Sequence, residues 1–257
     1  MLSPRGSGDR KGRPYKMIAT HPRKDTKMPQ SQKLKYRIKF IKTGNVRFIG
    51  HLDLMSLFNM AIKRASIPIA YSEGFNPHQL LSFALPLSLG YHSNAEYLDL
   101  SLTVPLECKE IVESLNAAMP DGIKITTAAH MPSDSKSSAS IISACDYTVV
   151  LPSEFKILDS TAKDFIAQKE IVINKKTKKS LTAVDITPDI LDFSTDATDE
   201  FVEKIHMRLS AGPERSLRAD SVVKALFSFA EVDYPENRLT YIREEMYADI
   251  EGTKPLL

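Results

Sequence analysis

The sequence predicts an α+β fold built from two halves, each with the element order β-α-β-β-α-β. Apolar residues alternate with polar ones along several short segments, as in half-buried strands. Between these segments apolar residues recur every three or four positions, as in amphipathic helices. A serine-rich stretch at 132–140 separates the two segments in which this order occurs. The 257 residues have room for one large domain or two modest ones.

The first half begins with a strand over 36–40, in which Tyr36, Ile38 and Phe40 alternate with Arg37 and Lys39. A change to helical spacing after residue 50 marks the first helix. The elements expected after the strand are a turn at 43–45, an extended segment at 46–49, a helix at 51–66 stopped by Pro68, extended segments at 69–72 and 97–102, a helix at 106–118 and a strand at 123–128.

The second half repeats this order with less regular spacing. Residues 187–200 are compatible with either a long hairpin or a loop. The elements expected here are strands at 147–151, 201–209 and 239–247, helices at 157–168 and 218–229, and extended segments at 171–173 and 181–186 around the basic turn Lys175 to Lys179. Two such units in a row predict tandem ferredoxin-like halves.

The sequence thus predicts five regions. They are a basic disordered tail at 1–35, a ferredoxin-like half at 36–131, a linker at 132–144, a second ferredoxin-like half at 145–250 and a tail at 251–257.

The net charge of +2 conceals an uneven distribution. Residues 1–35 contain ten basic and two acidic side chains, whereas residues 36–257 contain 24 basic and 30 acidic ones. The basic tail suits weak contacts with phosphates. A solvated extension upstream of a start at Met28 is the favoured alternative, because the tail shows no apolar period.

Several classes of protein are excluded by composition. No apolar stretch approaches the roughly 20 residues that cross a bilayer, and no secretory signal is present. The only cysteines, Cys108 and Cys145, are too few for a disulfide scaffold or a cysteine metal site. The histidines match no metal-ligand spacing. We therefore expect a cytoplasmic protein without a membrane partner, metal or cofactor.

Two neighbouring motifs in the first half carry the candidate binding residues. His51 and Asp53 begin a helix directly after Gly50, where free N–H groups favour an anion, although a structural role for both is also open. The loop 71–78 contains an aromatic side chain suited to stacking on a base, or alternatively to filling the core. The candidate residues are His51, Asp53, Arg64, Tyr71, Ser72, Gly74, Phe75, Asn76, His78 and Ser82.

The segment that contains both motifs, residues 47–90, resembles an uncharacterised bacterial family, the radical SAM-associated domain. The matching residues are Gly50-His51-Leu52-Asp53, Arg64-Ala65, Pro68, Tyr71-Ser72, Gly74 to His78, Ser82-Phe83 and Pro86-Leu87, with a weaker echo at 212–227. Members of that family are fused to, or encoded beside, B12-binding radical SAM proteins, and the resemblance therefore implies such a partner.

The chain departs from the family pattern at several positions that are usually basic. Ser56, Met60 and Lys63 stand where members usually carry arginine, and Gln79 and Leu80 replace a proline and a basic residue. These changes remove cations that could hold phosphate.

These observations favour a noncatalytic adaptor or RNA-binding module that serves a radical SAM partner in RNA modification or processing. Lys35, Arg37 and Lys39 fall on the strand face opposite Tyr36, where they would suit RNA. One alternative is a metal-independent, endoribonuclease-like enzyme that uses His51 or His78. Another is a scaffold that binds protein only. The chain is not itself a radical SAM enzyme, because two cysteines cannot hold the iron–sulfur cluster.

Overall fold

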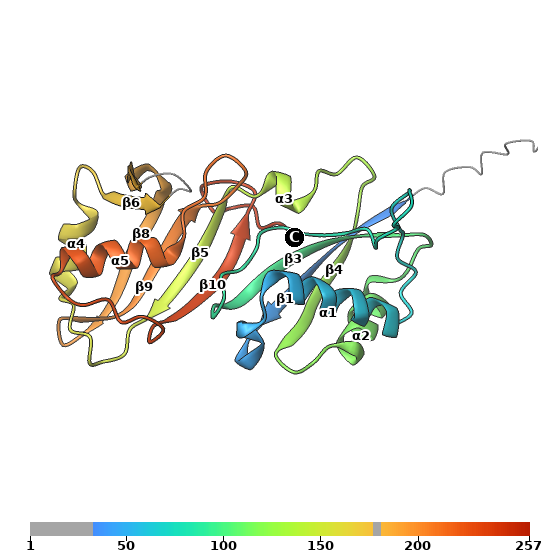
Figure 1. Ribbon diagram of the computed structural model, residues 1–257, viewed down its shortest axis with the longest axis horizontal. Coiled ribbons are helices and arrows are strands. Elements are labelled where there is room, and N and C mark those ends of the chain that lie inside the picture. The colour runs from blue at the N-terminus through green and yellow to red at the C-terminus, as the bar shows by residue number, and fades with distance from the viewer. Residues whose placement is uncertain (1–32, 177–180) are drawn as a thin grey trace, which may run out of the picture. The chain divides into compact units, whose positions relative to one another are not determined.

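The computed structural model describes residues 33–176 and 181–257, which contain five α-helices and ten strands (Figure 1). The tail expected at 1–35 lies outside these residues, except for its last three positions. Of the expected basic turn, residues 177–180 also lie outside them.

The first half forms a sheet in the order β4-β1-β3, with β2 paired to β3. Tyr36, Ile38 and Phe40 are buried on one face of β1, as their alternation predicts. Apolar side chains at helical spacing in α1, including Leu54 and Phe58, pack against this face. The elements are β1 (Leu34–Lys42), α1 (His51–Arg64), β2 (Leu81–Phe83), β3 (His92–Leu102), α2 (Cys108–Ala118) and β4 (Ile123–Met131).

One local prediction in this half is wrong, and a second segment pairs less than a strand does. The segment 46–49, expected to be extended, lies largely in a short 3-10 helix at Gly44–Phe48, which the left-handed backbone of Gly44 (φ 62°) begins. The segment 69–72, expected to be extended, makes isolated bridges at Ile69 and Tyr71 rather than a continuous ladder. The paired strand is β2 instead.

The second half forms the order β10-β5-β9-β8, with β6 and β7 as a separate two-stranded sheet. The hairpin alternative for 187–200 is confirmed, since β8 pairs with β9 across a turn in which Asp199 and Glu200 have positive φ. The elements are β5 (Ala144–Val150), α4 (Asp159–Ile166), β6 (Val172–Lys176), β7 (Leu181–Asp185), β8 (Ile190–Thr198), β9 (Phe201–Ser210), α5 (Ala219–Phe229) and β10 (Thr240–Tyr247). Between the halves, the linker contains the short helix α3 (Ser138–Ile141).

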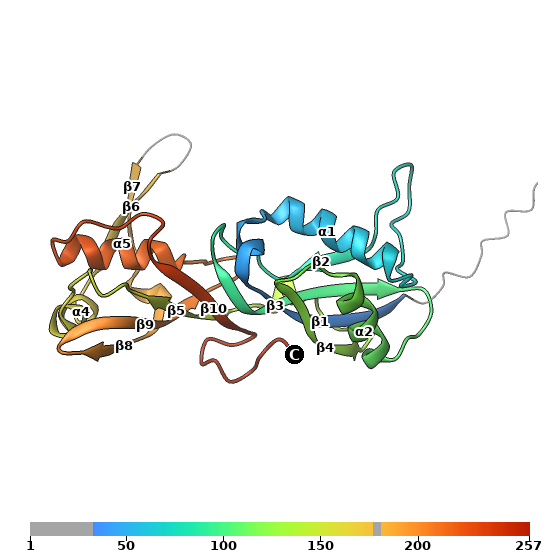
Figure 2. The ribbon, with the colours of Figure 1, turned by 90° about the horizontal axis from the view of Figure 1, so that it is seen from below.

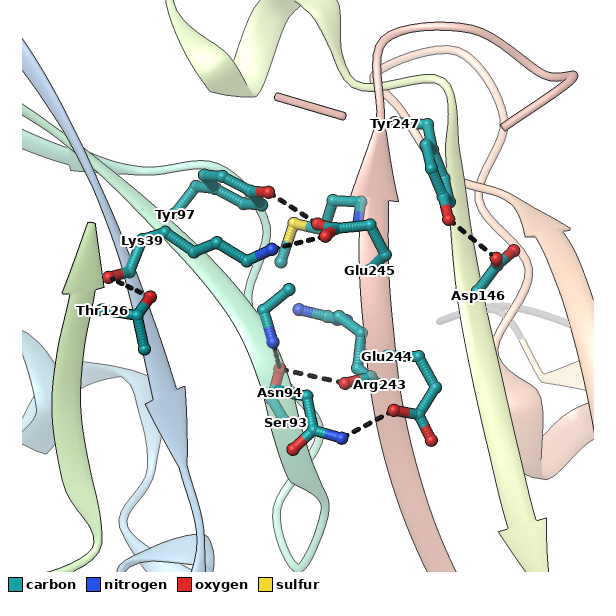
Figure 3. A network of polar contacts seen from close by, with 12 residues as sticks. Lys39, Ser93, Asn94, Tyr97, Thr126, Asp146, Arg243, Glu244, Glu245 and Tyr247 are labelled. Carbon is teal, nitrogen blue, oxygen red and sulfur yellow. Dashed lines mark hydrogen bonds and ion pairs between the residues drawn. The ribbon is translucent and has the colours of Figure 1, made fainter. Parts of the chain in front are cut away.

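One mixed sheet runs through both halves, because β3 pairs with β10 in parallel at two positions. Side chains extend this short junction (Figure 3): Asn94 donates a 2.6 Å hydrogen bond to Glu244, and Tyr97 donates one of 2.6 Å to Glu245. Beside them lies a fully buried ion pair, Arg243 Nη1 to Glu96 Oε1, at 2.8 Å. The described residues of the two halves belong to one compact unit.

The chain has two apolar cores, one within the first half and one in the second half that also includes Tyr91, Ala95 and Tyr97 of the first. In Figure 2, the long helix α1 of the first half and the long helix α5 of the second both lie above the strands. No helix among the described residues is long and apolar enough to cross a lipid bilayer.

The opposite face of β1 is not the open basic surface that the sequence predicts. Arg37 is 2% exposed, forms a 2.7 Å ion pair with Asp99, and donates a hydrogen bond to the carbonyl of Leu256 from the C-terminal segment. Lys39 pairs with Glu245, and Lys35 donates to the carbonyl of Ser135 in the linker. These three cations therefore hold the fold together.

Candidate functional site

The loop 71–78 is closed by three hydrogen bonds between the residues at its base. The Ser72 N–H donates to the His78 carbonyl at 2.8 Å, and the His78 N–H donates to Ser72 Oγ at 3.0 Å. Ser72 Oγ also lies 2.8 Å from His78 Nδ1. Gly74, with φ 114°, supplies a backbone conformation that side chains oppose. Serine, glycine and histidine at these positions therefore shape the loop, as the turn interpretation of the sequence predicts.

The Phe75 side chain at the tip of this loop is fully exposed, at 105% relative accessibility. The alternative that Phe75 fills the core is therefore wrong. By contrast, Phe40, Phe58 and Phe83 of the same half are buried and contact one another. A fully exposed aromatic side chain can gain free energy by burial in a partner, which makes Phe75 a candidate for a contact residue.

Tyr71 and Gln79 attach the base of the loop to α1. They form an isolated bridge, and the Gln79 Nε2 donates to the Asn59 carbonyl of α1 at 3.3 Å. Tyr71 is 45% exposed, and the loop that follows it is the teal loop beside α1 in Figure 2. The loop is thus held at a defined place relative to α1.

His51 and Asp53 lie at the start of α1, where the structure does not connect them to the loop. The His51 ring packs edge-on against Phe83, with ring centroids 5.4 Å apart. Asp53 is exposed in the first turn, where its charge suits the helix dipole, and Gly50 provides no side-chain cap. Among the described residues, no hydrogen bond or ring contact joins either side chain to residues 71–78.

Arg64 and Ser82 occupy two further places. Arg64 Nη2 donates to the Ala118 carbonyl at 2.6 Å, which links the ends of α1 and α2. Ser82 lies opposite Asp99 in the β2–β3 ladder and is exposed. The predicted residues therefore separate into a loop group, a pair at the start of α1 and two single positions.

A cavity of about 260 Å³ lies beside the base of the loop and brings His78 and Ser82 to a common space. Its floor includes the Arg37–Asp99 ion pair. The linker closes one side, where the Ser138 N–H donates to Asp99 Oδ2 at 2.6 Å. Sequence reasoning missed the contribution of Asp99 and the linker, because only the tertiary fold brings them to β1.

The geometry offers little for acid–base or nucleophilic chemistry. Ser72 and His78 form a pair, but no carboxylate contacts the His78 ring among the described residues, so the third member of a serine triad is missing. The His51 ring rests on an apolar partner. Within 33–176 and 181–257, no group of three or more metal-ligating side chains occurs.

A family model described as an uncharacterized protein conserved in bacteria, DUF2344, matches residues 35–219. No curated protein matches the chain significantly. Among solved structures, the crystal structure of an unknown protein from Galdieria sulphuraria is 15% identical, with 82% of this chain and 98% of that chain covered and a TM-score of 0.24.

Proposed function

The chain belongs to the DUF2344 family of uncharacterized bacterial proteins, and on that premise we propose that it is a noncatalytic adaptor that docks onto a protein partner through the loop 71–78. The partner that we propose is a B12-binding radical SAM protein, as the sequence resemblance implies. RNA as the ligand of this loop is the competing outcome that the experiment below distinguishes.

The exposure of Phe75 on a closed, anchored loop is the observation that carries this proposal. An aromatic side chain held in water by an ordered loop gives nothing to the stability of the free chain. Transferring it into a partner's pocket removes its apolar surface from water, which is worth about 1.5–3 kcal/mol. Because the loop is already closed, little conformational entropy is lost on docking.

The charges near the loop favour a protein over RNA. Binding to RNA depends on unpaired cations that neutralise phosphates. Residues 71–78 contain no lysine or arginine, and the only acidic residue among them is Glu73. The cations of β1 are engaged within the fold: Arg37 with Asp99, and Lys39 with Glu245.

We also infer that the two halves are ferredoxin-like units in tandem. The orders β4-β1-β3-β2 and β10-β5-β9-β8 are the same when the strands of each half are numbered from its own first strand and the separate hairpin of β6 and β7 is left out. Sheets of this kind often present loops and open faces to partners, which agrees with an adaptor.

The proposal is tested with the full 257-residue chain and the radical SAM protein encoded in the same genome. The dissociation constant is measured by calorimetry for the wild type, for Phe75→Ala and for the control Ile250→Ala, which shortens an exposed apolar side chain of the second half. We expect Phe75→Ala to weaken binding at least about tenfold, as at an interface hot spot, and the control to bind as the wild type does.

Two results would contradict the proposal. One is equal affinity of the wild type and Phe75→Ala for the radical SAM protein, or no binding by either. The other is loss of RNA affinity in Phe75→Ala without any complex with the protein, which would assign the loop to RNA.

A further inference from the structure

A second, more polar cleft lies between the two halves, away from the loop 71–78. It has a volume of about 380 Å³ and is lined by residues 47–48 and 89–91 of the first half and by parts of 218–241 of the second. We call it the inter-half cleft. Volumes of this size suit a small molecule or a short part of a larger ligand.

Four cations line the inter-half cleft against two carboxylates. Arg218 forms a two-pronged pair with Asp220, both contacts at 2.9 Å, and Lys224 lies 4.0 Å from Glu236. The remaining lining cations are Arg47 and Arg238, and Arg238 pairs with Glu154. The lining therefore has an excess of positive charge.

Arg47 is the cation that lacks an acidic partner among the described residues. Its Nη1 lies 2.7 Å from His92 Nε2, and its guanidinium stacks 4.7 Å from the centre of the Phe48 ring. Burial and the Arg47 charge lower the pKa of His92, so the ring stays neutral and accepts this hydrogen bond. The other guanidinium N–H groups are left for a ligand.

Three tyrosines also line the inter-half cleft. Tyr91 stacks on Tyr241 with ring centroids 4.6 Å apart and planes 9° apart. The Tyr241 hydroxyl lies 2.9 Å from that of Tyr234. Burial raises the pKa of Tyr91 and Tyr241, so both hydroxyls stay protonated. The Tyr91 hydroxyl accepts a 3.1 Å hydrogen bond from the Asp220 N–H and keeps its own proton to donate.

We propose that the inter-half cleft is a phosphate-binding site in which Arg47 is the principal ligand and Arg218 and Lys224 add attraction. A planar guanidinium matches the oxygens of phosphate with two parallel hydrogen bonds, and Arg47 is held for this by a neutral histidine and an aromatic ring. The phosphate belongs either to a free phosphorylated molecule or to the backbone of an RNA. The site is independent of the docking loop.

Calorimetric titration of the full chain at low ionic strength tests this site with two probes, inorganic phosphate and a short single-stranded RNA. The variants are Arg47→Gln, Arg218→Gln and the control Lys109→Gln, a cation of α2 that is 85% exposed. Arg218, whose side chain is 65% exposed, provides a second variant with little demand on folding. We expect Arg47→Gln to raise the dissociation constant at least about tenfold and Arg218→Gln to raise it less, with Lys109→Gln unchanged.

The two probes identify the source of the phosphate. Weakened binding of inorganic phosphate in both arginine variants supports a free phosphorylated ligand. Weakened RNA binding in these variants, with a strong dependence on salt in the wild type, supports the backbone of an RNA. The proposal is overturned if the wild type binds neither probe saturably, or if both arginine variants bind as the wild type does.

Discussion

Single residues of the first half divide into those that stabilise the fold and those that do not. Phe58 is completely buried between Phe40 and Phe83, whereas Phe75 is completely exposed. The same residue type thus has opposite roles within one half. Substitution of Phe58 is therefore expected to affect folding, and substitution of Phe75 to affect docking.

Phe58→Ala is expected to lower the free energy of unfolding by about 3–5 kcal/mol, because it leaves a cavity in the core. Phe75→Ala is expected to change it by less than about 0.5 kcal/mol, because the ring contacts water. Urea denaturation of the two variants and the wild type measures both values. A large loss of stability in Phe75→Ala would mean that the loop packs onto the body of the protein.

The two cysteines are expected to differ in reactivity. Cys145 is completely buried in β5, and burial raises the pKa of its thiol to about 11, so its reactive thiolate is scarce at pH 8. Cys108 is partly exposed at the start of α2. Titration with a thiol reagent at pH 8 should label one cysteine in the folded chain and two in guanidinium. Rapid labelling of two thiols without denaturant would contradict this packing.

At the scale of elements, the closed conformation of the loop 71–78 depends on two hydrogen bonds of the Ser72 side chain. Ser72 Oγ accepts from the His78 N–H and contacts the His78 ring. Ser72→Ala removes both contacts, and each is worth about 0.5–1.5 kcal/mol at most in so exposed a place. We expect global stability to change little, but amide hydrogen exchange within 71–79 to become faster.

Hydrogen exchange followed by mass spectrometry measures this effect on peptides that cover the loop. Peptides from β5 and β9 serve as an internal control and should exchange as in the wild type. Unchanged exchange within the loop would show that other contacts close it.

Some helices and strands could be predicted from the sequence alone, and others could not. The alternation in β1 and the helical spacing in α1 predict both elements, because each buries one face within its own half. The strand β2 has only three residues, too few for an alternation to be recognised, and β8 has no buried side chain to mark a core face. They are recognisable only from their pairing with β3 and β9.

For the candidate site too, the sequence predicts local structure but not which residues meet in the folded chain. Turn chemistry in the motif from Tyr71 to His78 predicts a loop, and the loop is present. Whether Phe75 faces water or the core depends on the packing around it, which local spacing does not encode. The sequence also could not predict that the cations on the other face of β1 are paired within the fold. Their partners, Asp99, Glu245 and the C-terminal segment, reach β1 only in the folded chain.

At the scale of the whole molecule, the junction of β3 and β10 joins the halves through a buried ion pair. Glu96 and Arg243 are each 2% exposed, and Arg243 also donates to the carbonyls of Leu85 and Pro86. Breaking a buried pair on one side is costly, because it leaves an uncompensated charge.

Glu96→Gln is therefore expected to lower the free energy of unfolding by about 3–5 kcal/mol, whereas the double variant Glu96→Met with Arg243→Met should recover much of that loss. Urea unfolding curves of the single and double variants measure both values. A Glu96→Gln chain as stable as the wild type would mean that the ion pair contributes nothing to the junction.

The docking role of the loop is the central claim, and site-specific photo-crosslinking tests it most directly. Benzoylphenylalanine replaces Phe75 in one chain and the exposed Ile250 in a control, and both are irradiated in cells. We expect a crosslink from position 75, but not from position 250, to the radical SAM protein, identified by mass spectrometry. Crosslinks from position 75 to RNA alone, or to the same molecules as from position 250, would contradict the claim.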